Sequence, residues 1–281
     1  MGNDFGEHGM HGLIMIASAA AIILLVKYGL LRGIDHVAGA MNWSVKARGK
    51  LTGFATSVPE LVCLVAAGLS GVWEAGLWNI ASSNIINCVL MLSAVLVYRQ
   101  FGDLMNRRFI DEIAFAGLAI MVPITLMYWG MDTEWYLVPS LLCFFGFYQF
   151  VDQKVNPPSE TESTSEEAVG NLPFGIIVAS TALIAIAIAG MFLGDSTAKV
   201  VLQLGIHPIV AGWILGFVTS IPEMVTFFAV YATAKREGKL HHLDDTQEAL
   251  DNLTGSNMSN VGIIYPIGLA AYLLGALLIG G

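Results

Sequence analysis

Charged side chains are scarce in this chain. Aspartate, glutamate, lysine and arginine make up 12% of its 281 residues, whereas hydrophobic residues make up 56%. In a soluble domain roughly a quarter of the residues are charged. The deficit excludes an ordinary globular domain, because the apolar residues also fall in long runs of the length that a bilayer requires.

Cysteines and basic clusters are also few. Cys63, Cys88 and Cys143 all lie in apolar segments, so we expect small buried residues that report no redox compartment. Much of the net charge of −9 lies in residues 159–167, and no basic stripe indicates nucleic acid as a partner. The first eleven residues contain no lysine or arginine, which predicts a retained membrane helix rather than a cleaved signal peptide.

Hydropathy predicts an all-α polytopic membrane protein with about eight transmembrane helices. Each apolar segment can cross about 30 Å of hydrocarbon at roughly 1.5 Å per residue, although the fifth is at the short limit. The segments span residues 12–31, 51–73, 75–98, 109–129, 135–151, 172–193, 208–234 and 249–272.

Basic residues concentrate in alternate loops, whereas the other loops contain only Lys199. This bias predicts an integral protein of the cell or inner membrane with the basic loops in the cytoplasm and the N-terminus outside. An acidic linker at 152–171, also expected in the cytoplasm, separates a first half (1–151) from a second half (172–281). The basic residues of these loops are Arg32, Lys46, Arg48, Lys50, Arg99, Arg107, Arg108, Lys154, Lys235, Arg236 and Lys239.

The two halves repeat each other. Residues 53–62 and 216–225 share G-F-x-T-S-x-P-E-x-V, and residues 79–87 and 252–260 share N-x-x-x-S-N-x-x-N. The first copy lies in segment two and the second in segment seven, five segments further along. Five is an odd number of crossings, so the copies enter the membrane from opposite sides. Such inverted-topology repeats are the architecture of secondary transporters.

Each T-S-x-P-E motif offers oxygen ligands. Its threonine, serine and glutamate share one helix face, and its proline frees the carbonyl four residues earlier. Hydroxyls, carbonyls and a carboxylate are hard ligands that suit Ca²⁺ or Na⁺. Glu60 lies ten residues beyond Lys50, about 15 Å of helix, and therefore near mid-bilayer. The alternative, a proline kink beside a protonated glutamate, is the less favoured reading because the motif occurs twice, in opposed helices.

The two blocks resemble the α-repeats of the calcium/cation antiporter superfamily, whose usual form is G-T-S-x-P-E followed by G-S-N-x-x-N or G-S-N-x-x-D. The resemblance implies a sodium/calcium exchanger-like protein whose motif residues coordinate the transported ions. The implied ligands are Gly53, Thr56, Ser57, Glu60, Ser83, Asn87, Gly216, Thr219, Ser220, Glu223, Ser256 and Asn260.

The chain also departs from that pattern. Ala55 and Val218 replace the usual glycine before Thr-Ser, and asparagine at both downstream positions leaves the motifs only two carboxylates. Basic residues at 46–50 stand where apolar residues are typical. Such relatives normally have ten helices, so the last two are missing here.

Loss of those two helices predicts an exposed flank on segment eight. We expect Gly262, Gly268 and Gly275 on that flank, with a second copy of the chain or another membrane subunit packed against them. Glu248 and Asp251 are expected at the start of segment eight, where negative charge complements a helix N-terminus.

The predicted function is a secondary active antiporter that exchanges Ca²⁺ for Na⁺, or H⁺, by alternating access in the lipid bilayer, with no tightly bound cofactor. A non-transporting membrane scaffold that keeps the exchanger fold is the alternative. The intact motifs favour transport, whereas the missing helices and the basic entrance favour the scaffold. An enzyme is not expected, since no nucleophile–base pair stands out in the segments.

Overall fold

The computed structural model describes residues 4–69, 71–155, 170–205, 207–238, 240 and 243–279. Every regular element in these residues is a helix, which confirms the all-α class. The first half contains α1 (Asp4–Leu25), the π-helix η1 (Val26–Leu30), α2 (Leu31–Met41), α3 (Val45–Thr56), α4 (Val58–Leu69), α5 (Trp73–Val97), α6 (Phe101–Leu104), the 3₁₀-helix η2 (Arg107–Phe109), α7 (Ile110–Tyr128) and α8 (Leu137–Val155). The second half contains α9 (Leu172–Leu204), α10 (Pro208–Thr219), α11 (Ile221–Arg236), α12 (Leu243–Ser259), the π-helix η3 (Asn260–Ile264) and α13 (Tyr265–Ile279).

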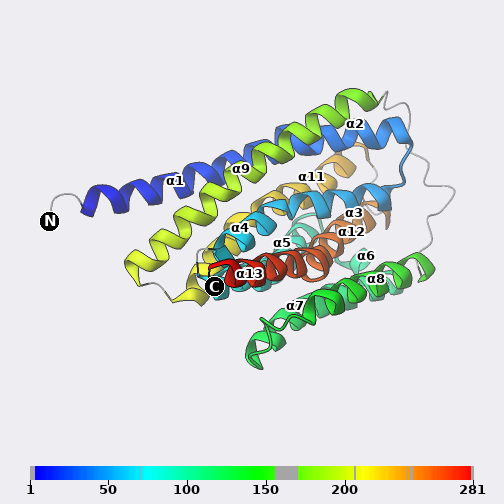
Figure 1. Cartoon of the computed structure of the whole chain (residues 1–281). Helices are drawn as coiled ribbons and strands as arrows, with labels where there is room; N and C mark the ends of the chain where they lie inside the picture. The colour runs from blue at the N-terminus through cyan, green and yellow to red at the C-terminus, as the bar shows by residue number, and fades with distance from the viewer. Residues whose placement is uncertain are drawn as a thin grey trace.

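The two halves run through the molecule in opposite directions (Figure 1). The chain passes from α3 to α4 from right to left in this view, and from α10 to α11 from left to right. Helix α3 packs along α12, and α5 packs along α10. The first motif of each half therefore packs against the second motif of the other half, as an inverted repeat requires.

Among the described residues, seven stretches are long and apolar enough to cross a membrane. The fifth predicted segment, 135–151, corresponds to helix α8, which lies beside α7 and is not among the seven (Figure 1). The seven stretches are Met10–Met41, Lys46–Leu69, Trp73–Val97, Arg107–Tyr128, Leu172–Thr197, Pro208–Arg236 and Leu243–Leu277.

Local signals start the two helices that carry the T-S-x-P-E motifs. The side chain of Ser44 caps α3 by accepting a hydrogen bond from the backbone N–H of Ala47 at 3.2 Å. The side chain of His207 caps α10 in the same way, and Pro208 follows at the first helical position. Both helices therefore begin at a defined residue.

Several helix ends differ from the sequence prediction. The first membrane stretch continues to Met41 because Lys27 and Arg32 lie on exposed positions within the helix, where their long side chains reach the surface. Helix α8 continues to Val155, so Asp152 is a buried helical residue rather than the first residue of the linker. Residues 156–169 of the predicted linker lie outside the described residues.

The prediction that Glu248 and Asp251 open their helix is wrong. Helix α12 begins at Leu243, so both residues lie further along it. Hydropathy misses this start because the early turns of α12 contain polar residues that are buried against protein, including Thr246 and Gln247.

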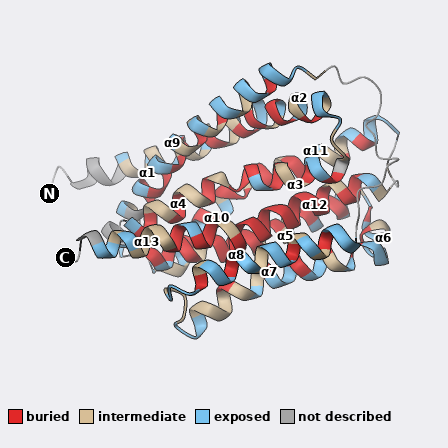
Figure 2. Cartoon of the chain, turned by 45° about the vertical axis from the view of Figure 1, so that its right-hand side comes forward, coloured by how far each residue is buried: buried red, intermediate tan, exposed pale blue. Residues whose placement is uncertain are grey.

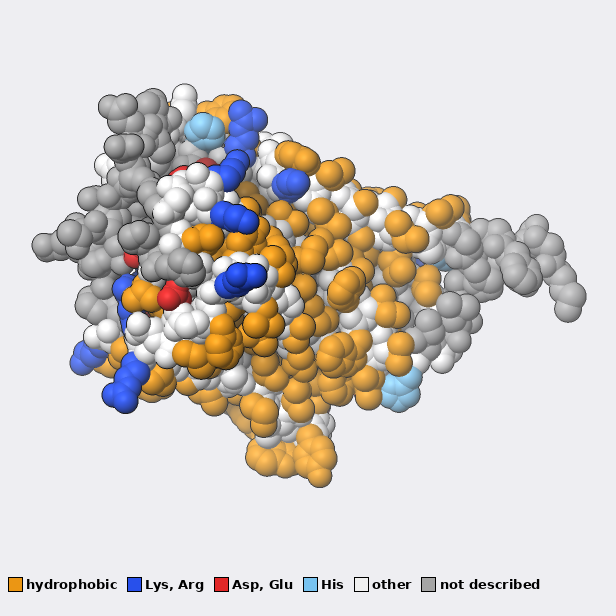
Figure 3. Space-filling view, turned by 180° about the vertical axis from the view of Figure 1, so that it is seen from behind, with side chains coloured by type: hydrophobic (Ala, Val, Ile, Leu, Met, Phe, Trp, Pro, Cys, Tyr) orange, Lys and Arg blue, Asp and Glu red, His pale blue; other side chains and the backbone are white. Residues whose placement is uncertain are grey.

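Burial is greatest in α3, α4, α5 and α12, at the centre of the molecule (Figure 2). Hydrophobic side chains cover much of the outer surface, and lysine and arginine gather toward one end (Figure 3). An apolar belt with one charged end fits an integral membrane protein. We call this the basic end; its cytoplasmic location remains a prediction.

The exposed glycine flank predicted for segment eight is not present. A Cβ atom at Gly268 would contact Leu64 of α4, and one at Gly262 would contact Phe145 of α8, so helices of the same chain cover these glycines. One at Gly275 would lie 3.1 Å from Leu69. Packing of a second copy or another subunit against segment eight stays a prediction. The small residues that were expected to form the contact surface are covered by other helices of this chain.

The three cysteines also differ from the expectation of uniform burial. Cys63 is buried, Cys88 is half-buried and Cys143 is exposed on α8. A thiol is apolar enough to face lipid, which hydropathy alone does not distinguish from burial within the protein.

Candidate cation site

Both T-S-x-P-E helices are broken at the serine of the motif, as the sequence predicts. Helix α3 ends at Thr56 and α4 begins at Val58, while α10 ends at Thr219 and α11 begins at Ile221. A proline follows each break at the second residue of the new helix and cannot donate a backbone hydrogen bond.

Each break creates a helix N-terminus inside the protein, and the motif glutamate lies in its first turn. Glu60 occupies this place in α4 and Glu223 in α11. The N-terminal end of a helix dipole favours negative charge. Both glutamates are 0% exposed, so their charges must be balanced by groups within the site or by bound cations.

The motif glycines allow the two repeats to approach closely. A Cβ atom at Gly53 would contact the carbonyl oxygen of Asn252 and lie 2.7 Å from the backbone nitrogen of Ser256. One at Gly216 would contact the hydroxyl of Ser82 and lie 2.9 Å from the backbone nitrogen of Ser83. These glycines therefore bring backbones together, a role beyond the ion ligation that the resemblance implied for them.

Ser256 connects the two halves. Its hydroxyl oxygen lies 2.8 Å from that of Ser57, donates a hydrogen bond to Glu223 at 3.1 Å and accepts one from the Asn87 amide at 3.3 Å. Asn260 makes the corresponding cross-repeat contact by donating to the Ser83 hydroxyl at 3.3 Å. The predicted ligands of the two repeats thus form one connected group.

The two carboxylates also face the opposite repeat. Their charges interact, and Thr219 lies beside Glu60 while Thr56 lies beside Glu223. The hydroxyl of Thr219 also lies 3.2 Å from the side-chain oxygen of Asn79, within hydrogen-bonding distance.

Six oxygens of predicted ligands accept no hydrogen bond from any described residue. Buried oxygens without a donor are costly, and native proteins contain few of them. A cation placed among them would satisfy several at once. The six are Oε1 and Oε2 of Glu60, Oε2 of Glu223, Oδ1 of Asn87, Oδ1 of Asn260 and Oγ of Ser220.

The ten predicted ligand side chains are between 0% and 1% exposed, so the site is closed to both ends of the molecule. The carbonyl of Gly53 already accepts the hydroxyls of Thr56 and Ser57, at 3.2 and 2.9 Å. The carbonyl of Gly216 accepts that of Thr219 at 3.5 Å. The two glycine carbonyls are therefore partly occupied within their own helices.

Sequence reasoning missed the asparagines that support these ligands. Asn84 accepts from the Asn260 amide at 2.8 Å and donates to the carbonyl of Ala119 on α7 at 2.9 Å. Asn257 accepts from the Asn87 amide at 3.1 Å and donates to the carbonyl of Asn84 at 3.1 Å. Both stand at the shared asparagine of S-N-x-x-N, which was the available signal.

A profile of the family described as "Sodium/calcium exchanger protein" matches residues 11–151 and 173–277 of this chain. The chain belongs to the sodium/calcium exchanger family. This is a family of transporters rather than enzymes, and its members exchange cations across membranes. Among curated proteins, none matches the chain significantly.

The chain also resembles solved structures of the sodium-calcium exchanger NCX_Mj. In crystals soaked with 100 mM Na⁺ and 10 mM Sr²⁺, that protein is 20% identical, with a TM-score of 0.56 over 95% of this chain and 89% of the other. In crystals soaked with 10 mM Na⁺ and no Ca²⁺ the identity is 22% and the TM-score 0.53, over 95% and 90% of the two chains. This likeness confirms the exchanger fold.

Proposed function

We propose that this cation exchanger is a secondary active antiporter that moves Ca²⁺ against Na⁺ or H⁺ by alternating access. The observation that carries the proposal is the set of six buried, unsatisfied oxygens around Glu60 and Glu223. Two carboxylates supply two negative charges, which one Ca²⁺ or two monovalent cations neutralise. Oxygen ligands of this kind suit Ca²⁺ and Na⁺.

The inverted repeat supports alternating access. Glu60 and Glu223 occupy equivalent places in oppositely directed broken helices. The site is therefore flanked by similar helices toward each side of the membrane. Rocking of one repeat against the other about such a site is the usual way in which inverted repeats expose it alternately. We place the N-terminus outside and the linker in the cytoplasm, as the basic loops favour.

The non-transporting scaffold loses one of its arguments. The basic entrance that favoured it includes Lys46 and Lys50, and both lysines pair with Asp152 on α8. The carboxylate of Asp152 balances one of these two positive charges within the protein, which weakens the argument that they repel a cation from the central site.

Flux measurements test the proposal. We expect Glu60→Gln and Glu223→Gln each to reduce sodium-dependent ⁴⁵Ca²⁺ uptake into proteoliposomes to background, because each removes half of the negative charge of the site. Glu74→Gln changes an exposed glutamate in the first turn of α5 and serves as the control, with uptake near wild type. Wild-type uptake by either site variant would contradict the assignment, and absence of uptake by the folded wild-type protein would favour the scaffold.

A further inference from the structure

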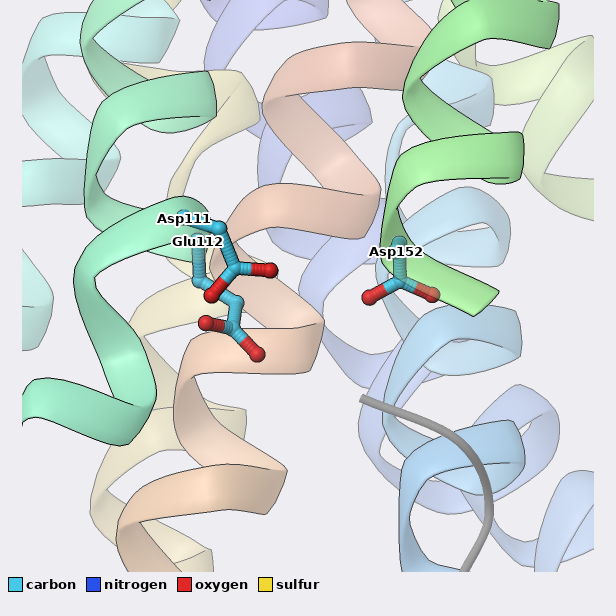
Figure 4. Close-up of side chains that lie close together, drawn as sticks. All are labelled: Asp111, Glu112 and Asp152. Atoms are coloured by element: carbon cyan, nitrogen blue, oxygen red, sulfur yellow. The ribbon is translucent and has the colours of Figure 1, made fainter. Parts of the chain in front are cut away.

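A second group of acidic side chains lies toward the basic end, outside the motifs that the two repeats share. Asp111 and Glu112 stand in the first turn of α7, and Asp152 stands near the end of α8. One carboxylate oxygen from each lies within 4.8 Å of the others (Figure 4). Two oxygens on opposite sides of one Ca²⁺, at about 2.4 Å each, are separated by about the same distance.

A fourth carboxylate joins this group from α12. The side-chain amide of Gln247 donates to Glu112 at 3.2 Å and to Asp251 at 2.9 Å, and so links the two carboxylates. Asp251 is 0% exposed, and Glu112 and Asp152 are each 1% exposed. Carboxylates from two consecutive helices, α7 and α8, and from the distant helix α12 therefore meet in one largely buried place.

Two lysines contact this group. Lys46 lies 2.8 Å from Oδ1 of Asp152, and Lys50 contacts Oδ2 of the same carboxylate. A divalent cation bound among these carboxylates would therefore compete with both ammonium groups for Asp152.

Other buried oxygens near these carboxylates also lack hydrogen-bond partners among the described residues. The hydroxyl of Tyr148 is buried on α8 and makes no hydrogen bond to a described residue, although it lies within electrostatic reach of all four carboxylates. Oδ1 of Asp251 and Oε1 of Gln247 are likewise without a donor in the described part of the chain. These atoms are separate from the cluster of three carboxylates. Their lack of partners indicates a ligand that oxygen atoms can coordinate, such as a cation.

The position of the group relates it to the central site. Asp251 precedes Ser256 by five residues on the same helix, a rise of about 7.5 Å. The carboxylates therefore lie between the central site and the basic end of the molecule.

We propose that Asp111, Glu112, Asp152, Asp251 and Tyr148 form a second site for a divalent cation, at which the cation competes with Lys46 and Lys50 for Asp152. The site holds a cation arriving from the basic end before it passes to Glu60 and Glu223. That onward passage rests on the proposed antiport function, whereas the binding itself does not.

Equilibrium binding of ⁴⁵Ca²⁺ to the purified full-length protein tests the site. The double variant Glu60→Gln/Glu223→Gln removes the central site, and we expect it to retain about one Ca²⁺ per chain. Adding Glu112→Gln to that background should weaken the remaining binding at least tenfold. Adding Asp244→Asn, which changes an exposed carboxylate in the first turn of α12, should leave it unchanged.

A second variant separates binding from a structural role. In the same background Lys46→Gln removes a competing ammonium, so we expect Ca²⁺ to bind roughly tenfold more tightly, because like charges at this separation repel strongly in a poorly solvated site. Terbium luminescence, excited through tyrosine, should fall in Tyr148→Phe. A residue with a purely structural role would not produce a gain of affinity.

The outcomes distinguish the two proposals. Binding by wild type that is fully lost in the folded central-site double variant would refute the second site and leave the antiporter intact. Residual binding unaffected by Glu112→Gln would also refute it. If Glu112→Gln does not fold, Asp251→Asn takes its place with the same expectation. No Ca²⁺ binding by folded wild-type protein would refute both proposals.

Discussion

Gly53 and Gly216 are important because they have no side chain. Each stands where the backbone of a first-motif helix meets the second-motif helix of the other half, with no room for a Cβ atom. The helix that would be displaced from Gly53 is α12, which carries Ser256 and continues directly into η3, where Asn260 is the first residue. Close packing and ligand placement are therefore the same requirement at these residues.

Alanine at Gly53 should consequently reduce both stability and transport. We expect Gly53→Ala to lower the midpoint of thermal unfolding in detergent, at a cost of about 1–3 kcal/mol for an overpacked contact, and to reduce ⁴⁵Ca²⁺ uptake. Gly117→Ala in α7 is the matched control, because an added Cβ there has nothing within 4 Å. It should be neutral or stabilise the helix by up to about 1 kcal/mol. A Gly53→Ala protein with wild-type midpoint and uptake would show that α3 and α12 can separate freely.

At the scale of helices, α1, η1 and α2 form one long stretch that packs along α9. Small residues permit this contact: a Cβ atom at Gly29 would lie 2.9 Å from that of Ala182, and Gly33 faces the backbone of Ala179. Close approach of backbones through small residues is the common mode of packing between membrane helices.

Cysteines at Gly29 and Ala182 test that packing. In a background without native cysteines, Gly29→Cys/Ala182→Cys should form a disulfide, since the two Cβ atoms would lie 2.9 Å apart and a small separation of the helices brings them to the roughly 3.8 Å that a disulfide requires. A protease site placed in the linker makes the result visible, because the two halves stay joined on a non-reducing gel only when cross-linked. Leu24→Cys/Ile184→Cys, at exposed positions, should give separate halves. The reverse pattern would contradict the helix pairing.

Hydropathy and the repeat predicted most helices but not all of their ends. A long apolar run identifies a helix whose side chains face lipid, so the lipid-facing segments were predicted correctly. The first turns of α12 were missed because Thr246 and Gln247 are polar yet buried against protein. The glycines of segment eight were misplaced because sequence does not show whether Phe145 or lipid covers Gly262.

The candidate site was predictable for a different reason. Its ligand types recur at fixed spacing in two copies, which a single sequence displays directly. The second acidic group offered no such pattern, since its carboxylates come from the ends of α7 and α8 and from within α12. Their proximity depends on tertiary packing alone.

For the whole molecule, the inverted repeat fixes which loops share a side. Glu74 at the start of α5 and Glu237 at the end of α11 occupy equivalent places in the two halves, and both are exposed. In a cysteine-free background we expect a membrane-impermeant maleimide to label Glu74→Cys in intact cells. Glu237→Cys should react only after permeabilisation. Labelling of both from one side would contradict the inverted topology.

The asparagines at positions 87 and 260 have a consequence for the membrane potential. With no further carboxylate in the motifs, Glu60 and Glu223 give the central site two negative charges, and one Ca²⁺ or two monovalent cations bring it to zero. The electric field acts on net charge, at about 2.3 kcal/mol per elementary charge per 100 mV, so it does no work on a neutral loaded site. We predict that an imposed potassium diffusion potential of either sign leaves the rate of ⁴⁵Ca²⁺ uptake unchanged, with a voltage-sensitive dye confirming the potential. A rate that changes several-fold with its sign would reveal an additional transported charge. An exchanger built in this way is electrically silent, and the concentration gradients of its ions alone set its direction.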